Sequence, residues 1–218
     1  MKSLSSFYLG YFVPASTLIP IVAGLLYYKK INTPLRTLLV YLIASFIINV
    51  AGIILADHHI NNLPLLHFYT IIEIVAIMLY YLKAFGPGKI HKWIKGIMIL
   101  FPLLCIVNFC FFQSIYEFNT YTRPLEALII ILITGCYFTI QHDLKNSALI
   151  TRSGRLVAAG FMIYFCSSLF QFIFSNIVSQ KASGDIKLFI WDIHATFVLI
   201  MYLLFFRAII DERNKRQY

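Results

Sequence analysis

Charged residues are scarce in this chain. Asp, Glu, Lys and Arg together make up 12% of its 218 residues, whereas hydrophobic residues make up 60%. Soluble domains carry about 25% charged residues. A chain with so little charge and so much apolar surface cannot bury that surface in one soluble core. The composition therefore predicts an integral membrane protein that has the lipid bilayer as its solvent.

Cysteine pairs and the common cofactor motifs are also missing. All four cysteines fall inside apolar stretches and form no Cys-x-x-Cys pair, which argues against disulfides and a zinc knuckle: Cys105, Cys110, Cys136 and Cys166. The sequence has no Gly-rich phosphate loop, nucleophile elbow or haem motif, so we expect no cofactor. The last apolar stretch also lacks the lysine that a retinal photoreceptor needs.

Seven apolar stretches dominate what is present. Each is close to the roughly 20 residues that cross the hydrocarbon core as a helix, and none alternates as the strands of a membrane barrel do. We predict an all-α fold, a single seven-helix transmembrane domain over residues 1–218. The predicted helices lie near residues 7–28, 37–56, 63–82, 93–112, 124–141, 156–178 and 188–206.

The basic residues gather on one side of the predicted bundle, after the first, third, fifth and seventh helices. This set comprises Lys29, Lys30, Arg36, Lys83, Lys89, Lys92, Lys95, Lys145, Arg152, Arg155, Arg207, Arg213, Lys215 and Arg216. The positive-inside rule then predicts an outside N-terminus and a cytoplasmic C-terminus, in a bacterial inner (cytoplasmic) membrane. We expect this rim to contact anionic lipid headgroups. Its placement argues against nucleic-acid binding despite the net charge of +9.

The last three stretches echo the first three at a few positions. The corresponding residues are Pro14 with Pro124, Tyr41 and Ser45 with Tyr164 and Ser168, and Lys83 with Arg207. Two halves of three helices each have the same orientation only if one linker helix separates them. The fourth stretch would be that linker, which predicts a 3+1+3 parallel repeat.

In this layout the chain resembles the SWEET and PQ-loop carriers, which are parallel-repeat transporters. The resemblance covers all seven stretches and implies a solute carrier. The Pro-Gln dipeptide of that family is absent, since Pro14, Pro20 and Pro124 are followed by Ala, Ile and Leu. By length and topology the chain also resembles small bacterial seven-helix membrane proteins and the seven-helix input modules of sensor kinases. That second resemblance implies a separate signalling partner protein.

Ionisable side chains inside the membrane indicate where function is located, because each costs roughly 2.5–3.5 kcal/mol to insert. Glu73 is the deepest of them, and Tyr69 shares its helix face four residues earlier. Arg123 lies three residues before Glu126, so these two should pair. With an outside N-terminus, the outer half of the bundle holds His67, Glu126, Asp192 and His194.

Two interpretations of these polar residues remain open. The first is an outward-facing cavity with Glu73 at its floor and His67, Glu126, Asp192 and His194 on its walls. The second is a set of hydrogen bonds and ion pairs that hold the helices together.

Three functions follow from the cavity interpretation. A ligand-sensing or receptor-like module would bind an unidentified small molecule and use its basic tail, residues 211–218, to dock a partner. A small-solute or proton-coupled carrier would use Glu73 as the proton site. An intramembrane lipid hydrolase would bind a metal through His67, Asp192 and His194. No stretch contains a His-x-x-x-His pair, so we lean away from an enzyme and favour the receptor-like module.

Overall fold

The computed structural model describes residues 2–143, 151–181 and 183–215, and within them the chain is helical with no strand. Lys145 and Arg216 of the predicted basic rim lie outside the described residues. Seven helical segments are long and apolar enough to span a membrane, which confirms the all-α, seven-helix prediction. These spans are Leu4–Leu26, Thr33–Asp57, Leu63–Ala84, Ile90–Phe111, Thr122–Thr139, Arg152–Ser175 and Gly184–Lys215.

The first span is interrupted because it contains two prolines. It consists of α1 (Lys2–Phe7), the π-helix η1 (Tyr8–Phe12), α2 (Val13–Ser16) and α3 (Leu18–Leu26). Pro14 and Pro20 have no N–H, so the carbonyl groups one turn earlier lose their usual partners. In η1 the N–H of Val13 instead donates to the carbonyl of Tyr8, five residues earlier. The N–H of Thr17 donates to the carbonyl of Pro14 at 3.2 Å.

The other spans are continuous helices. They are α4 (Thr33–Asp57), α5 (Leu63–Ala84), α6 (Ile90–Phe111), α7 (Thr122–Asp143), α8 (Arg152–Lys181) and α9 (Gly184–Lys215). Helices α8 and α9 exceed the predicted stretches 156–178 and 188–206, with 30 and 32 residues. Hydropathy detects only the apolar part of each helix. Residues with good helix propensity, such as Glu212 and Arg213 near the end of α9, continue the helix beyond the hydrocarbon.

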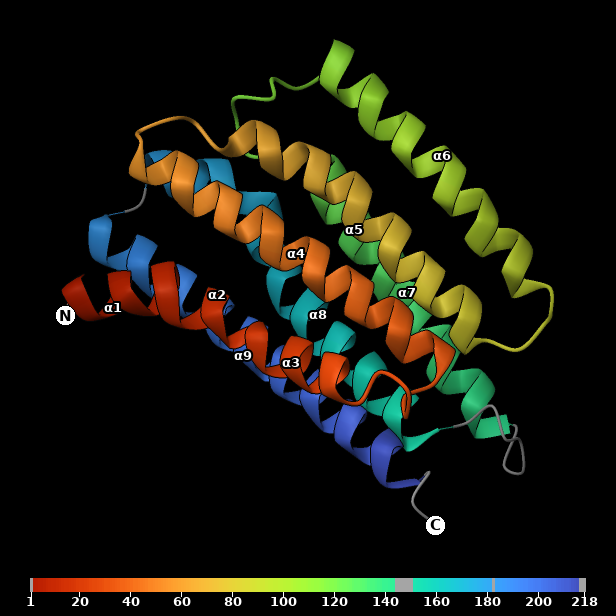
Figure 1. Cartoon of the computed structure of the whole chain (residues 1–218). Helices are drawn as coiled ribbons and strands as arrows, with labels where there is room; N and C mark the ends of the chain where they lie inside the picture. The colour runs from red at the N-terminus through yellow and green to blue at the C-terminus, as the bar shows by residue number, and fades with distance from the viewer. Residues whose placement is uncertain (1, 144–150, 182, 216–218) are drawn as a thin grey trace.

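All spans except α6 form a closed ring. Figure 1 shows α6 set apart from the other helices. Around the ring, α4 packs on α5, α5 on α7, α7 on α8 and α8 on α9. The first span closes the ring by packing against both α9 and α4. Helix α6 lies outside the ring, mainly against α5.

The order of contacts is the same in the two halves of the ring. The first three spans follow one another in the ring, and so do α7, α8 and α9. Because successive spans alternate in direction, the contact of α5 with α7 and that of the first span with α9 join parallel helices. These two parallel contacts lie opposite each other. A 3+1+3 parallel repeat with α6 as linker predicts this arrangement.

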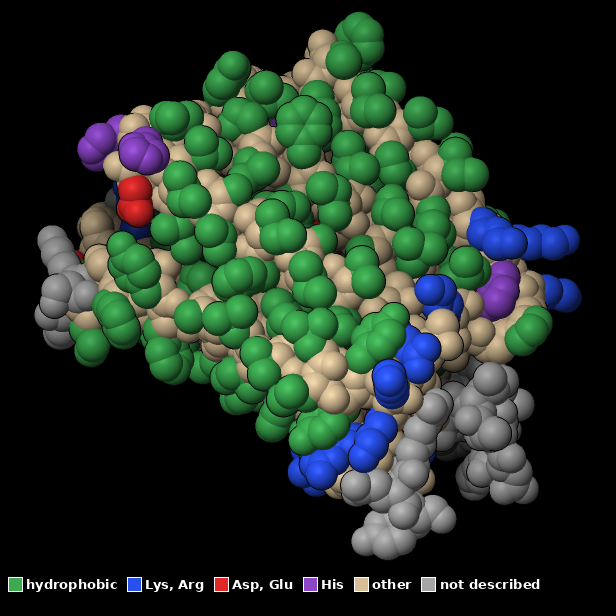
Figure 2. Space-filling view, in the orientation of Figure 1, with side chains coloured by type: hydrophobic (Ala, Val, Ile, Leu, Met, Phe, Trp, Pro, Cys, Tyr) green, Lys and Arg blue, Asp and Glu red, His purple; other side chains and the backbone are tan. Residues whose placement is uncertain are grey.

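The bundle has two ends with different surfaces. The N-terminal face comprises the N-terminus and the 58–62 and 112–121 loops, whereas the basic face comprises the 27–32 and 85–89 loops and the end of α9. Between the faces many large apolar side chains are exposed, as a lipid-facing surface requires. Examples are Leu26, Val40, Trp93, Ile99 and Leu132. Figure 2 shows hydrophobic side chains over most of the visible face, with Lys and Arg gathered at one end.

Aromatic rings fill the ring of helices toward the basic face. We refer to Tyr80, Tyr81, Phe161 and Phe205 as the aromatic layer, and all four are fully buried. Phe161 is central, with its ring centroid 5.0 Å from that of Phe205 and 5.9 Å from that of Tyr80. Gly160 allows this packing, because a Cβ atom there would lie 2.7 Å from Cε1 of Phe205.

Candidate functional site

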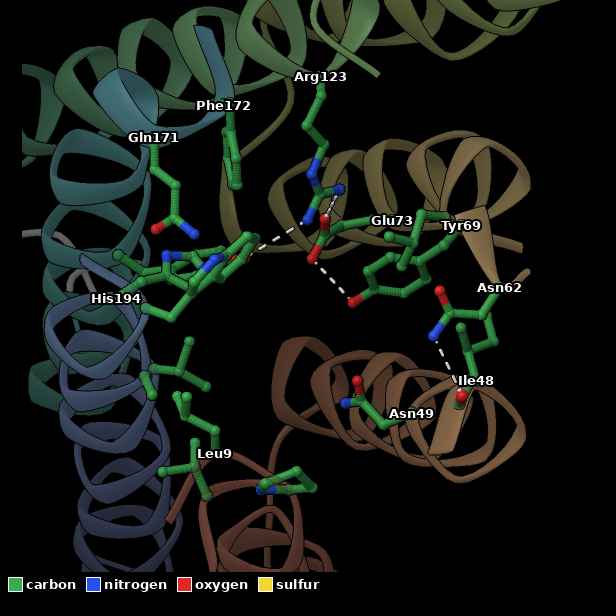
Figure 3. A pocket seen from close by; sticks show the side chains of 18 of the residues that line it. Leu9, Ile48, Asn49, Asn62, Tyr69, Glu73, Arg123, Gln171, Phe172 and His194 are labelled. Atoms are coloured by element: carbon green, nitrogen blue, oxygen red, sulfur yellow. Dashed lines mark hydrogen bonds and ion pairs between the residues drawn. The ribbon is translucent and has the colours of Figure 1, made fainter. Parts of the chain in front are cut away.

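A cavity of about 520 Å³ lies inside the ring, in the half nearer the N-terminal face (Figure 3). We call it the central cavity. Its volume is in the range of sites that bind small molecules. Much of its wall is apolar or aromatic, including Leu66, Phe118, Phe172, Trp191, Val198 and Met201. The polar side chains that line it include Asn49, Tyr69, Glu73, Arg123, Gln171 and His194.

Glu73 lies at the floor of the central cavity and is almost completely enclosed, with 1% of its surface exposed. Its Oε1 accepts hydrogen bonds from the hydroxyl groups of Tyr41 at 2.7 Å and Tyr69 at 2.9 Å. Its Oε2 accepts a hydrogen bond from Arg123. Both oxygens of this carboxylate are therefore satisfied. The predicted sharing of one helix face by Tyr69 and Glu73 takes the form of a direct hydrogen bond.

Arg123 joins helices from the two halves of the ring. Its Nη1 donates to Glu73 on α5 and to Oε2 of Glu126, three residues further along α7, at 2.9 Å. Its guanidinium also lies over two aromatic rings, 4.8 Å from the centroid of Phe172 and 5.4 Å from that of Tyr69. Arg123 thus has both carboxylate and cation–π partners in a site away from bulk water. The predicted pairing of Arg123 with Glu126 is present.

Asn119 fixes the position of Arg123 by capping α7. Its Oδ1 accepts hydrogen bonds from the backbone N–H groups of Thr122 at 3.0 Å and Arg123 at 3.2 Å. These N–H groups belong to the first turn of the helix and have no partner within it. The Asn119 amide also donates to the Thr70 hydroxyl at 3.3 Å, which ties the start of α7 to α5. The cap therefore places the guanidinium beside Glu73.

Glu126 pairs with Arg123 but does not line the wall of the central cavity. The side chain is fully buried, and its Oε1 has no hydrogen-bond partner. The cavity wall includes Arg123 and Glu73 but not Glu126. Side chains three residues apart are neighbours on one helix face, so Glu126 contacts Arg123 although it does not line the cavity. We use the term ion cluster for Glu73, Arg123 and Glu126.

Two hydrogen bonds on either side of the cavity involve the serines that the predicted repeat pairs. Ser45 on α4 bonds to the Tyr69 hydroxyl on α5 at 2.8 Å. Ser168 on α8 bonds to Nδ1 of His194 on α9 at 2.9 Å. The two serines correspond in the proposed repeat, and each bonds to a polar ring on the next helix. Both Tyr69 and His194 line the central cavity.

His67 and Asp192 lie elsewhere. The Nε2 of His67 bonds to the backbone carbonyl of Glu117 at 2.9 Å, and its ring packs edge-on against Phe109 of α6. Asp192 accepts a hydrogen bond from Ser5 at 2.6 Å and so faces the first span. Neither side chain lines the central cavity. Asp192 and His194 are two residues apart on one helix, so they point about 200° away from each other.

The residues suggested as metal ligands are therefore not brought together. His67, Asp192 and His194 each bond to a different neighbour on a different element. Within the described ranges no group of three or more His, Cys, Asp or Glu side chains could hold a metal ion. The residues that the hydrolase hypothesis needs do not form a metal site.

Several cavity residues were not selected as site residues from the sequence. These are Arg123, Tyr41, Asn49, Asn119, Tyr164 and Gln171. A signal was available for Arg123, because an arginine near the start of an apolar stretch needs an acidic partner across the bundle. Tyr41 and Gln171 gave no such signal, because uncharged polar side chains in membrane helices often serve only as hydrogen-bond partners between helices.

Comparisons with protein-family models, curated protein sequences and solved structures find no match to this chain.

Proposed function

We propose that this multi-pass membrane protein is a receptor-like module that binds a small molecule in the central cavity. The observation that carries this proposal is the combination of a 520 Å³ cavity and the ion cluster at its floor. A ligand in the cavity would contact Arg123, which is 14% exposed. Any shift of this side chain changes its contacts with α5 and with the rest of α7. Ligand binding would therefore alter the packing between the two halves of the ring.

Helix α9 offers a route from the cavity to the other face. Its first half lines the cavity with Trp191, His194 and Val198. At 1.5 Å per residue its 32 residues extend roughly 48 Å, more than the hydrocarbon thickness of about 30 Å. The end of α9 is tied to the start of α8 by an ion pair of Arg152 with Asp211 at 3.0 Å. We propose that this basic end is cytoplasmic and docks a signalling partner.

The experiment is native mass spectrometry of the protein released from detergent micelles. A discrete small molecule should accompany the wild-type chain. It should be absent from Ala195→Leu, a variant in which a larger side chain occupies the cavity wall. A bare chain, or a chain carrying only mixed phospholipids in both proteins, would contradict the proposal.

A carrier is the second candidate, and one observation favours it. A smaller cavity of about 180 Å³ lies toward the basic face, lined by residues of the same α4, α5, α7 and α8 that line the central cavity. Tyr41 lines the central cavity and Tyr80 lines the smaller one. The ring of Phe161 packs against both tyrosines, with centroids 6.0 Å and 5.9 Å away. A movement of Phe161 would therefore change the packing between the two cavities.

Liposome flux separates the two candidates. A receptor-like module binds the molecule found by mass spectrometry without moving it across the membrane. A carrier releases it from loaded liposomes, and Phe161→Trp should then slow the flux while binding persists. Flux equal to that of protein-free liposomes would exclude the carrier.

A further inference from the structure

The wall of the central cavity contains a hydrogen-bond donor that has no acceptor. The Nε2 of Gln171 on α8 has no hydrogen-bond partner. The residue is only 6% exposed, so water does not readily supply one. Figure 3 shows Gln171 pointing into the cavity. A buried N–H group without an acceptor is costly, and native proteins seldom leave one without a reason. An acceptor atom on a ligand would satisfy it.

A second side chain in the same wall, Arg123, has N–H groups that are not fully used in hydrogen bonds. The Nη1 of Arg123 serves Glu73 and Glu126, but its Nη2 has only a long contact of 3.4 Å with the Tyr164 hydroxyl. A guanidinium has five N–H donors and no acceptor. In Figure 3 the side chains of Gln171, Phe172 and Arg123 all point into the cavity. This part of the wall therefore presents donors, with an aromatic ring between them in the view.

The charges around the cavity argue against a charged ligand. Arg123 already has two carboxylates beside it, so an added anion would be the third negative group around one cation. A cation would need the oxygens of Glu73, which are engaged by Tyr41, Tyr69 and Arg123. The rest of the wall is largely apolar and would desolvate any ion without compensation. An uncharged acceptor avoids all of these costs.

We infer that the central cavity binds an uncharged, mostly apolar molecule with a carbonyl-type acceptor, which is held by the Gln171 amide and faces the Arg123 guanidinium. Lipophilic ketones, lactones and quinones belong to this chemical class. The inference rests on the proposed function, because it names the ligand chemistry of the same cavity. A carbonyl oxygen has two lone pairs, which suits a wall that offers more than one donor.

The test uses four naphthalene probes of similar shape, titrated calorimetrically into the full chain in nanodiscs. They are 2-acetonaphthone (an uncharged carbonyl), 2-ethylnaphthalene (no acceptor), 2-naphthoate (an anion) and 1-(2-naphthyl)ethylamine (a cation). Nanodiscs with the Ala195→Leu protein provide the blank for partitioning into lipid. Above that blank, 2-acetonaphthone should bind about tenfold more tightly than 2-ethylnaphthalene, as one hydrogen bond to a desolvated donor predicts. The two ions should bind more weakly than either.

Gln171→Met is the decisive variant, because methionine has a similar length and no N–H group. It removes an unpartnered buried donor, so the free protein should be at least as thermally stable as wild type. The tenfold preference for 2-acetonaphthone should disappear, while the affinity for 2-ethylnaphthalene stays the same. Preference for the anion or the cation, or a carbonyl preference that survives in Gln171→Met, would overturn the inference and leave the binding cavity intact. If no probe binds above the blank and native mass spectrometry finds no ligand, the proposed function fails as well.

Discussion

The two halves of this bundle are stabilised in different ways. Toward the basic face, the aromatic layer fills the ring of helices, and Gly160 lets a phenylalanine approach the backbone. Toward the N-terminal face, the ring encloses a cavity, and a buried ion cluster joins its helices. In lipid there is little hydrophobic force between helices, so close packing and polar contacts must hold them together. One half uses the first means and the other half uses the second, which leaves room for a ligand.

The comparison predicts the largest effect at Arg123. Replacement by methionine leaves Glu73 and Glu126 buried without a cation, which should cost about 3–5 kcal/mol of folding free energy. Unfolding of the protein in mixed micelles, followed by circular dichroism, measures the loss. The triple variant Arg123→Met, Glu73→Gln, Glu126→Gln removes both charges and should recover most of it. A triple variant no more stable than Arg123→Met would show that the ion cluster is not what holds this half.

Two buried tyrosines offer a matched pair, one in each half. The Tyr41 hydroxyl donates to the Glu73 carboxylate, whereas the buried Tyr80 hydroxyl has no partner. Hydrogen bonds to charged groups contribute about 1.5–3 kcal/mol, so Tyr41→Phe should lose that much. Tyr80→Phe should be neutral or stabilising. Equal losses in the same unfolding assay would contradict the contrast between the halves.

Glycine substitutions test the packed half. Gly160→Ala places a Cβ atom against Phe205, and such overpacking costs typically 1–3 kcal/mol. Gly135 on α7 has open space where a Cβ atom would lie, with no neighbouring atom within 4 Å, so Gly135→Ala is the control and should be neutral or slightly stabilising. Thermal denaturation in detergent distinguishes them. A stable Gly160→Ala would mean that the aromatic layer is looser than described.

The smallest stability effect is expected from filling the cavity. Ala195 lines the central cavity, so Ala195→Leu should change the free energy of unfolding by less than about 1 kcal/mol. The same change at Ala208, which is fully buried on α9 in the packed half, should cost about 1–3 kcal/mol. Melting temperatures of the two variants, measured side by side, give the result. A large loss at both sites would indicate that the cavity has no spare room.

The sequence predicted the fold well because the signals for a membrane protein are local. Apolar length identified all seven spans, and helix spacing identified the contacts of Tyr69 with Glu73 and of Arg123 with Glu126. The interrupted helix of the first span was harder to predict from the sequence. Pro14 and Pro20 indicate a disturbance, but they do not specify a π-helix over η1.

The site was predicted only in part, because it depends on which way each helix turns about its axis. His194 faces the cavity while Asp192, two residues earlier, faces the first span. The sequence indicates how far along its helix each residue lies, but it does not indicate the direction in which the side chain points around the helix axis. The role of Arg123 depends on the Asn119 cap, which belongs to a loop and has no hydropathy signal. Long-range contacts of this kind appear only in three dimensions.

Accessibility of one isosteric pair tests the central claim, that one half of the bundle encloses the central cavity whereas the aromatic layer fills the centre of the other half. Val198→Cys lines the central cavity, and Val157→Cys is fully buried in the packed half. Each is placed in a background without the native cysteines and exposed to a small, uncharged thiosulfonate in intact nanodiscs. The account predicts rapid labelling at position 198 and none at position 157 until the protein is unfolded. A position 198 as unreactive as position 157 would contradict it.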